Sequence, residues 1–417
     1  MAESPYRLPT SVVPERYELE VATDLAARTF SGSVRITLEV REPVREILLN
    51  AVDLEITEPV VRAGDVEVPV REVRAEPETE RVRVVLGADL APGAATISLA
   101  FAGALNPRLV GYYASTYRDE SGVEHTVAAT HFESTDARRA FPCFDEPEMK
   151  ASFAVSLVVD DGLFAVSNAR EIGREAAAPG RTRIRFADSM RMSTYLVAFV
   201  VGRLEATAPM DVDGVPLRIV HVPGKGHLTR HGLEAGAASL RYFTRYYGIP
   251  YPGDKLDMVA LPDFSMGAME NLGCITYREA LLLVDPARAS QGEVQVVGEV
   301  VAHEIAHMWF GDLVTMRWWN GIWLNEAFAS LMETLAMDDW RPDWELWNQF
   351  ARARSVALEV DALASTRAIE YPVESPDDSQ DMFDVLTYTK GQAVLRMLER
   401  YLGDGFREGI RSYLAEH

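Results

Sequence analysis

Two histidines and a glutamate stand at a spacing that can bind and use a metal ion. They form the segment His303-Glu304-Ile305-Ala306-His307. If the segment is helical, His303 and His307 share one face, because residues four apart lie one above the other. Both imidazoles can then bind one cation. Glu304 is rotated by about 100° from His303, so it lies beside the cation and can take a proton from a bound water. The pattern therefore predicts a metal-assisted hydrolytic site.

Catalytic metal sites need a third protein ligand and one open position. The best candidate is Glu326, which follows His307 by 19 residues and falls early in a predicted helix at 322–337. An antiparallel return of that helix would bring its carboxylate back to the first helix. Two imidazoles and one carboxylate favour zinc, although cobalt and manganese fit the same donors. We expect one Zn²⁺ per chain, held by His303, His307 and Glu326.

The flanks of the two histidines are strongly apolar, which predicts a buried helix. The apolar flanking residues are Val296, Val297, Val300, Val301, Met308, Trp309 and Phe310. Histidine and glutamate side chains are costly to bury without a partner, so a metal site is favoured over an accidental pair of surface histidines. A second pair at the same spacing, His227 and His231, has polar neighbours and lacks the glutamate. We expect a solvated helix start there.

The elements that must position these residues change in character near residue 203. Before it, short runs alternate apolar and polar residues between Gly, Pro, Asp and Asn clusters, which predicts an antiparallel β-sandwich for residues 1–203. The clearest predicted strands are 30–40, 81–86, 95–101, 153–159, 182–186 and 195–201. Residues 204–417 are predicted to be mostly helical. We expect helices at 233–247, 294–310, 322–337, 344–358 and 391–402, strands at 217–222 and 256–261, and an irregular segment at 262–273.

Four segments, spread over both halves, resemble the zinc aminopeptidases of the aminopeptidase N family, which are gluzincins. The segments are 132–142 (FESTDARRAFP), 267–271 (GAMEN), 303–307 (HEIAH) with Glu326, and 388–391 (YTKG). The resemblance implies a multidomain α and β fold, with a saddle-like N-terminal β-sandwich followed by a thermolysin-like, mostly helical α/β catalytic domain. Family members are typically much longer than this sequence, so we expect their C-terminal helical domain to be absent.

The resemblance also implies roles in catalysis and in binding the substrate's free amine. Glu270 would bind the α-amino group, and Glu133, on the β-rich domain, would be a second acid for it. The site would then lie between the two domains. Tyr388 would hydrogen-bond the oxyanion, since a phenol can donate to developing negative charge. A structural ion-pair network that holds the domains together is expected from Arg138, Arg139 and Asp145.

The remaining predicted site residues would contact the peptide itself. Gly267 and Ala268 would let the backbone pair with an extended substrate as a strand edge. Met266 would line the pocket for the first side chain, and its pliable side chain suits a broad specificity. Met269 and Asn271 complete the substrate-binding segment. His131 stands where the family usually has glutamine, and it could donate to a carbonyl or simply line the pocket.

The predicted function is hydrolysis of the N-terminal peptide bond, releasing single neutral, hydrophobic or basic amino acids. Glu304 would move the proton from water to the leaving amine. A thermolysin-like endopeptidase would share the metal ligands, but the context of Glu270 argues against it. An epoxide-hydrolase relative typically has glycine where this chain has Ala268. A non-enzymatic scaffold usually loses zinc ligands or the base, and here all are present.

Composition narrows the partners further. The 417 residues are 48% apolar and 25% charged, with a net charge of −22. This balance argues against nucleic acid and anionic membranes, and it suits a cationic ligand. Two cysteines, Cys143 and Cys274, give no disulfide framework and indicate a reducing compartment. The first residues show no apolar stretch of signal-peptide length, and no apolar run reaches 18 residues. We expect a cytoplasmic monomer that binds peptides with a free N-terminus, and neither nucleic acid nor membrane.

Overall fold

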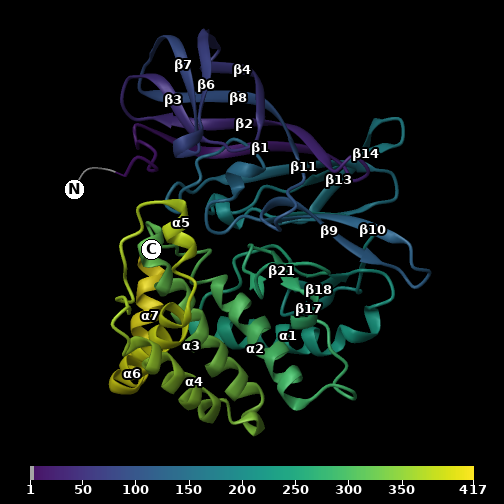
Figure 1. The fold of residues 1–417 in the computed structure, drawn as a ribbon, viewed down its shortest axis with the longest axis vertical. Coiled ribbons are helices and arrows are strands. Elements are labelled where there is room, and N and C mark those ends of the chain that lie inside the picture. Colours follow the sequence, from purple (N-terminus) through teal and green to yellow (C-terminus); the bar gives the residue numbers. More distant parts are fainter. Residues whose placement is uncertain (1–3) are drawn as a thin grey trace. The chain divides into compact units, whose positions relative to one another are not determined.

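The computed structural model describes residues 4–417, which form two compact units. The first unit extends to Leu204 and also includes Asn271–Cys274. The second unit comprises Glu205–Glu270 and Ile275–His417. In Figure 1 most of the first unit is purple to blue, and the second runs from teal to yellow. A β-rich unit therefore precedes a unit that carries most of the helices.

Three sheets build the described part of the first unit. The largest has the strand order β13-β14-β11-β1-β2-β8-β4-β5, the second β12-β15-β10-β9, and the third β3-β7-β6. The strands of the largest sheet are β1 (Val12–Asp24), β2 (Thr29–Val40), β4 (Glu55–Ala63), β5 (Val66–Val68), β8 (Gly93–Ala104), β11 (Ser152–Asp160), β13 (Glu171–Ala178) and β14 (Arg181–Phe186). The others are β3 (Val44–Asn50), β6 (Val70–Glu76), β7 (Arg81–Leu90), β9 (Gly111–Arg118), β10 (Glu124–His131), β12 (Phe164–Ser167) and β15 (Phe199–Gly202).

The alternation that predicted these strands matches their burial. In β2, Phe30, Val34 and Ile36 are buried, while Ser33 and Arg35 between them are exposed. Such alternation is expected for a strand with one face on a core. Pairing is antiparallel throughout the largest sheet except between β1 and β11, which run parallel. A parallel pair needs a long connection, and most of the unit's other strands lie between these two in sequence.

One predicted strand, 195–201, is wrong in its first half. A 3₁₀ turn, η3, occupies Thr194–Leu196, and strand β15 begins only at Phe199. The hydroxyl of Ser193 donates to the Pro147 carbonyl at 2.5 Å, and that of Thr194 donates to the Phe144 carbonyl at 2.9 Å. Side-chain bonds of this kind offer the backbone an alternative to a sheet ladder, which an apolar run does not reveal.

The second unit combines one sheet with a group of helices. The sheet has the order β16-β18-β19-β21-β20, with β17 paired to β18. Its strands are β16 (Glu205–Ala206), β17 (Met210–Val212), β18 (Val215–His221), β19 (Leu256–Leu261), β20 (Ala268–Met269) and β21 (Cys274–Arg278). The helices are α1 (Arg230–Tyr247), α2 (Gln291–His307), α3 (Ile322–Trp340), α4 (Leu346–Asp361), α5 (Pro376–Gln380), α6 (Gly391–Leu402) and α7 (Asp404–Glu416), and a π-helical turn, η8, spans Leu386–Lys390.

Helix α2 packs against both α1 and α3, and these three helices appear in teal and green in Figure 1. Its start is fixed by a capping box, in which Ser290 and Glu293 bond each other's backbone N–H. Such a cap satisfies two otherwise orphaned donors. Helix α2 therefore begins three residues before the predicted 294, and it ends at His307. Strand β20 and helix α7 were not predicted, and β20 lies inside the segment expected to be irregular.

The prediction of a solvated helix start at His227 and His231 is wrong for His231. Helix α1 begins at Arg230, three residues before the predicted 233, and His231 is buried while His227 is exposed. The Nε2 of His231 lies 2.9 Å from the Val294 carbonyl oxygen. Its ring lies beside Trp340, with 5.8 Å between centroids. The longer helix places this histidine on the face that packs against α2.

None of the helices described within residues 4–417 combines the length and apolarity needed to cross a membrane.

Candidate metal centre and active site

Helices α2 and α3 bring the three predicted metal ligands together in the second unit. The Nε2 of His303 lies 3.1 Å from Oε2 of Glu326, and the Nε2 of His307 lies 3.5 Å from the same oxygen. All three residues are at least largely buried, and one ligand atom from each lies within 4.8 Å of the others. This is the geometry expected of three groups that bind one cation.

Hydrogen bonds at the far side of each ring set which nitrogen carries the proton. The Nδ1 of His303 lies 2.6 Å from Oε2 of Glu333, and the Nδ1 of His307 lies 3.0 Å from the carbonyl oxygen of Phe310. A carbonyl oxygen and an ionised carboxylate can only accept hydrogen bonds. Both Nδ1 atoms are therefore donors. In the neutral rings the two Nε2 lone pairs then face the Glu326 carboxylate. Three electron-rich atoms in one place require a cation between them, so the residues fit a metal ion.

The pKa directions agree with a site built for positive charge. Burial acts to lower the pKa of His303, but hydrogen bonds to Glu326 and Glu333 raise it well above its ordinary value. Burial also opposes the charged form of His307, yet Glu270 and Glu326 raise its pKa to about 9. For Glu326, burial works against the carboxylate, and the two imidazoles nevertheless lower its pKa. In the metal-free cluster, protons therefore take the place of a cation.

Glu304, the predicted proton acceptor, follows His303 on α2 and is buried. Burial raises the pKa of its carboxyl above the ordinary range. A carboxyl group with a raised pKa can accept and return a proton near neutral pH. Burial raises the pKa of the Tyr277 phenol, and the negative charge of Glu304 raises it further. The local environment therefore suits Glu304 to general-base work.

Glu270 carries a buried carboxylate oxygen that faces no hydrogen-bond donor among the described residues. This oxygen is Oε1, and it lies 4.0 Å from Nδ1 of His307. Burial raises the pKa of the Glu270 carboxyl, and the charge of His307 acts in the opposite direction. A buried acceptor without a donor is costly. An ammonium group from a ligand would supply the missing donor.

The residues before Glu270 form a short strand at the edge of a sheet. Ala268 and Met269 make up β20, which pairs with β21 and is the last strand in the order of its sheet. A Cβ added at Gly267 would meet only the Leu281 side chain, at 3.4 Å, so the surrounding fold leaves space there. Met266 is half-buried. A strand at the end of a sheet can accept an extended peptide.

Tyr388 lies in the π-helical turn η8, and its ring is 6.0 Å from the His303 ring, at 28° between planes. Isolated π turns often mark functional sites. Asp384 stabilises the turn, because its Oδ1 accepts the backbone N–H groups of Leu386 and Thr387 at 2.9 and 3.0 Å. Arg367 donates to the same carboxylate at 2.6 Å. The structure thus holds the predicted oxyanion donor next to a predicted metal ligand.

The glycine of the YTKG segment has a packing role. A Cβ added at Gly391 would lie 2.5 Å from the Ala327 Cβ, a distance that side chains do not tolerate. Helix α6 begins at Gly391 and packs on α3, which carries Glu326. Glycine at this position therefore allows the close approach that puts Tyr388 beside the helix with the carboxylate ligand.

Three predicted site residues belong to the first unit: Glu133, His131 and Asn271. Their roles toward the metal centre stay predictions. His131 ends β10, and its Nδ1 lies 3.3 Å from the Leu109 carbonyl oxygen. Burial lowers the pKa of His131 to about 4, so the ring is neutral at pH 7 and donates to that carbonyl.

The predicted ion-pair network around Arg138 is present, and its partners lie within the first unit. Arg138 bonds Asp145 and Glu80 at 2.9 Å each, and Arg139 bonds Asp136 at 2.7 Å. Buried arginines need such partners. The pairs therefore connect the 3₁₀ turn Ala137–Arg139 with turn and loop residues of the same unit, and a role in holding the domains together stays a prediction.

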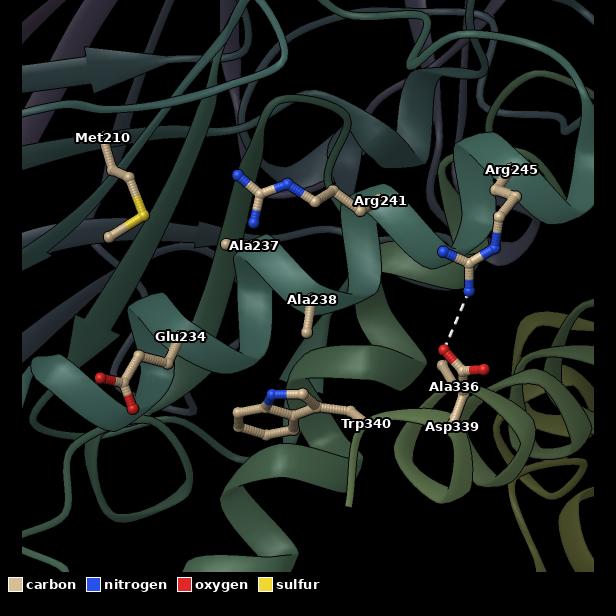
Figure 2. A pocket seen from close by; sticks show the side chains of 9 residues that line it. All are labelled: Met210, Glu234, Ala237, Ala238, Arg241, Arg245, Ala336, Asp339 and Trp340. Atoms are coloured by element: carbon tan, nitrogen blue, oxygen red, sulfur yellow. Dashed lines mark hydrogen bonds and ion pairs between the residues drawn. The ribbon is translucent and has the colours of Figure 1, made fainter. Parts of the chain in front are cut away.

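A cavity of about 510 Å³ lies elsewhere in the second unit, and Figure 2 shows the side chains that line it. The lining residues are Met210, Glu234, Ala237, Ala238, Arg241, Arg245, Ala336, Asp339 and Trp340. Arg245 and Asp339 pair across it at 2.9 Å (Figure 2). None of the predicted site residues lines this cavity, so it is separate from the metal centre.

Sequence reasoning missed Glu333, which bonds the far nitrogen of His303. A signal was available, because Glu333 follows Glu326 by seven residues on a predicted helix. Two turns of helix return to nearly the same face. A carboxylate on the ligand-bearing face could therefore have been singled out.

A helix-borne HExxH pair, a carboxylate from the next helix and a buried glutamate beside them define a metallohydrolase type of site. Comparison with known families agrees with this class. The peptidase family M1 domain model matches residues 231–417, and the peptidase M1 N-terminal domain model matches residues 13–196. Together these models cover most of the chain. The chain belongs to peptidase family M1.

The curated relatives are named aminopeptidases. Aminopeptidase M1-D from Oryza sativa subsp. japonica is 40% identical over 412 residues, which cover 99% of this chain and 47% of the relative. Aminopeptidase M1 from Arabidopsis thaliana is 40% identical over 416 residues, with the same shares. Endoplasmic reticulum aminopeptidase 1 from Homo sapiens is 38% identical over 416 residues, covering 99% of this chain and 44% of the relative. The chain spans about half the length of these relatives.

Proposed function

We propose that this protein is a zinc-dependent aminopeptidase that removes single residues from the N-terminus of peptides. The observation that carries the proposal is the convergence of His303, His307 and Glu326 beside a buried Glu304. Peptide substrates are further supported by the names of the relatives, which are aminopeptidases.

One Zn²⁺ per chain would be held by the Nε2 atoms of His303 and His307 and the carboxylate of Glu326. When bound, zinc supplies Lewis acidity toward a carbonyl oxygen and toward water. Glu304 takes the proton of the attacking water and delivers it to the leaving amine. Tyr388 donates its phenolic hydrogen to the oxyanion that develops on the carbonyl.

The free amine of the substrate would be recognised by acids. Glu270 offers the buried, unpaired Oε1 already described, which suits an ammonium group. Glu133 is proposed as a second acid for the same amine. The end strand β20, with Gly267 and Ala268, would pair with the substrate backbone, and His131, Met269 and Asn271 are proposed to line the site. Binding of the amine one residue from the scissile carbonyl would restrict cleavage to the first bond.

The preferred first residues are proposed to be neutral, hydrophobic or basic. Met266 is half-buried next to the edge strand, and an unbranched thioether adapts to side chains of different shape. We also propose a cytoplasmic monomer. Free and buried Cys143 and Cys274 are consistent with a reducing compartment.

The test is a panel of fluorogenic aminoacyl substrates, assayed on this chain and on a longer chain that reaches the length of the relatives. Activity should vanish with a chelator and return with zinc. In Glu304→Gln, turnover should fall by about 10²–10⁴-fold while zinc stays bound. Turnover that survives in this variant would remove Glu304 from its role. A chain that cleaves amine-blocked peptides equally well would not be an aminopeptidase.

A further inference from the structure

Both nitrogens of the His303 ring contact carboxylates of the same helix. Nε2 lies 3.1 Å from Glu326, and Nδ1 lies 2.6 Å from Glu333. The two glutamates are seven residues apart on α3, so they lie nearly on one face and about 10 Å apart along the axis. The imidazole, which comes from α2, is held between them. His307 differs, because its Nδ1 bonds the backbone carbonyl of Phe310.

From this arrangement we infer that Glu333 is a positioning residue for the metal ligand His303. Its carboxylate accepts the Nδ1 hydrogen, fixes the ring orientation, and keeps the Nε2 lone pair directed at the cation. A carboxylate behind a histidine ligand also makes that ligand more basic. The inference rests on the proposed zinc site and adds to it a residue that does not touch the metal.

Two carboxyl groups, those of Glu333 and Glu299, lie near the His303 ring. Glu333 is partly buried, with 22% of its side chain exposed, and its bond to His303 is a short one. Glu299, one turn before His303 on α2, lies in the same neighbourhood. Burial and the charge of Glu333 raise the pKa of Glu299 to about 8. Of these two carboxyl groups, Glu333 is the one with a described hydrogen bond to His303.

Glu299 provides a matched control. Like Glu333 it is a half-buried glutamate on the same pair of helices. Its described interactions are with Glu333, and it makes no described hydrogen bond to His303. Glu299→Gln changes a carboxyl group near the ligand and leaves the Nδ1 bond in place. An effect that depends on the hydrogen bond to Nδ1 of His303 should therefore appear in variants of Glu333 and not in Glu299→Gln.

The experiment measures zinc affinity of the metal-free protein by competition with a chromophoric chelator. Loss of such a partner weakens metal binding by about 10–100-fold. For Glu333→Ala we expect a loss of zinc affinity toward the upper end of this range. Glu333→Gln keeps a neutral acceptor for the Nδ1 hydrogen and should lie between the two. Glu299→Gln should stay within about twofold of the wild type. The cobalt-substituted proteins should show a changed visible spectrum in Glu333→Ala and a spectrum close to wild type in Glu299→Gln.

The outcomes separate this inference from the proposed function. If the wild type binds zinc and Glu333→Ala binds it as tightly, the positioning role is wrong and the zinc site stands. Equal weakening in Glu299→Gln and Glu333→Ala would also overturn it, because a general disturbance near His303, and not loss of the Nδ1 bond, would then explain the effect. If Glu333→Ala does not fold, the nearly isosteric Glu333→Gln decides, and wild-type affinity there contradicts the inference. A wild type that binds no zinc would overturn both proposals.

Discussion

The Nε2 of His303 lies 3.1 Å from Oε2 of Glu326, although 23 residues separate them in the sequence. The two side chains come from neighbouring helices, α2 and α3, that pack along each other. Because each helix is rigid over several turns, the distance between these two metal-ligating atoms is set by helix packing in the core and not by a loop. A cation site built in this way is formed before the cation arrives.

Removing the phenolic hydroxyl of Tyr388 should slow catalysis without loosening substrate binding. In Tyr388→Phe we expect kcat on an aminoacyl anilide to fall by about 10²–10³-fold, because one donor to the oxyanion is lost. KM should change by no more than a few-fold, since the donor acts chiefly in the transition state. Steady-state kinetics at saturating zinc measure both values. An unchanged kcat would show that Tyr388 does not touch the oxyanion.

Neutralising Glu270 should slow the hydrolysis of substrates that have a free α-amino group. A hydrogen bond to a charged group contributes about 1.5–3 kcal/mol, so kcat/KM for a free-amine substrate should fall by about 10–100-fold in Glu270→Gln. Glu359→Gln, at an exposed position on α4, serves as the control and should leave kcat/KM unchanged. The role would be refuted if the wild type hydrolysed an N-acetylated substrate as well as the free amine.

The packing of α6 on α3 should not tolerate a methyl group at Gly391. The added Cβ would lie 2.5 Å from the Ala327 Cβ, and overpacking of this kind costs about 1–3 kcal/mol. Gly409→Ala, in the exposed middle of α7 with no atom within 4 Å of the new Cβ, should instead stabilise by about 0.5–1 kcal/mol. Denaturant unfolding compares the two. Equal effects would contradict the close contact.

The free energy of unfolding should fall in mildly acidic solution, partly because His231 becomes protonated. Burial lowers the pKa of His231 in the folded protein, and its bond to the Val294 carbonyl only partly offsets this. The unfolded chain, with a histidine pKa of about 6.5, then binds more protons. The stability from neutral His231 is therefore present above that pKa and is lost as pH falls below it. Unfolding at pH 7.5 and 5.5 should show a smaller loss for His231→Gln, which cannot titrate. An equal loss would exclude His231 as a source.

The predicted metal ligands and general base could be found from the sequence because their spacing places them on or beside one face of a helix. His303, Glu304 and His307 needed only the helical period, and Glu326 needed only a returning helix. Tyr388 and Glu270 needed the resemblance to a family, since one tyrosine or one glutamate has no periodic signature.

Other features depended on tertiary contacts that no local pattern contains. Glu333 matters only because the His303 ring reaches it from another helix. The burial of His231 follows from an earlier start of α1 and from the packing of α1 on α2. The 3₁₀ turn at Thr194 depends on carbonyl groups about 50 residues away. Hydrophobic periodicity cannot report such partners.

The most direct test is a crystal structure of the zinc-loaded protein with anomalous data at the zinc edge. We predict one strong anomalous peak per chain, at a zinc ion bonded to the Nε2 atoms of His303 and His307 and to the carboxylate of Glu326. A peak at another site, or none after soaking the metal-free protein in zinc, would contradict it.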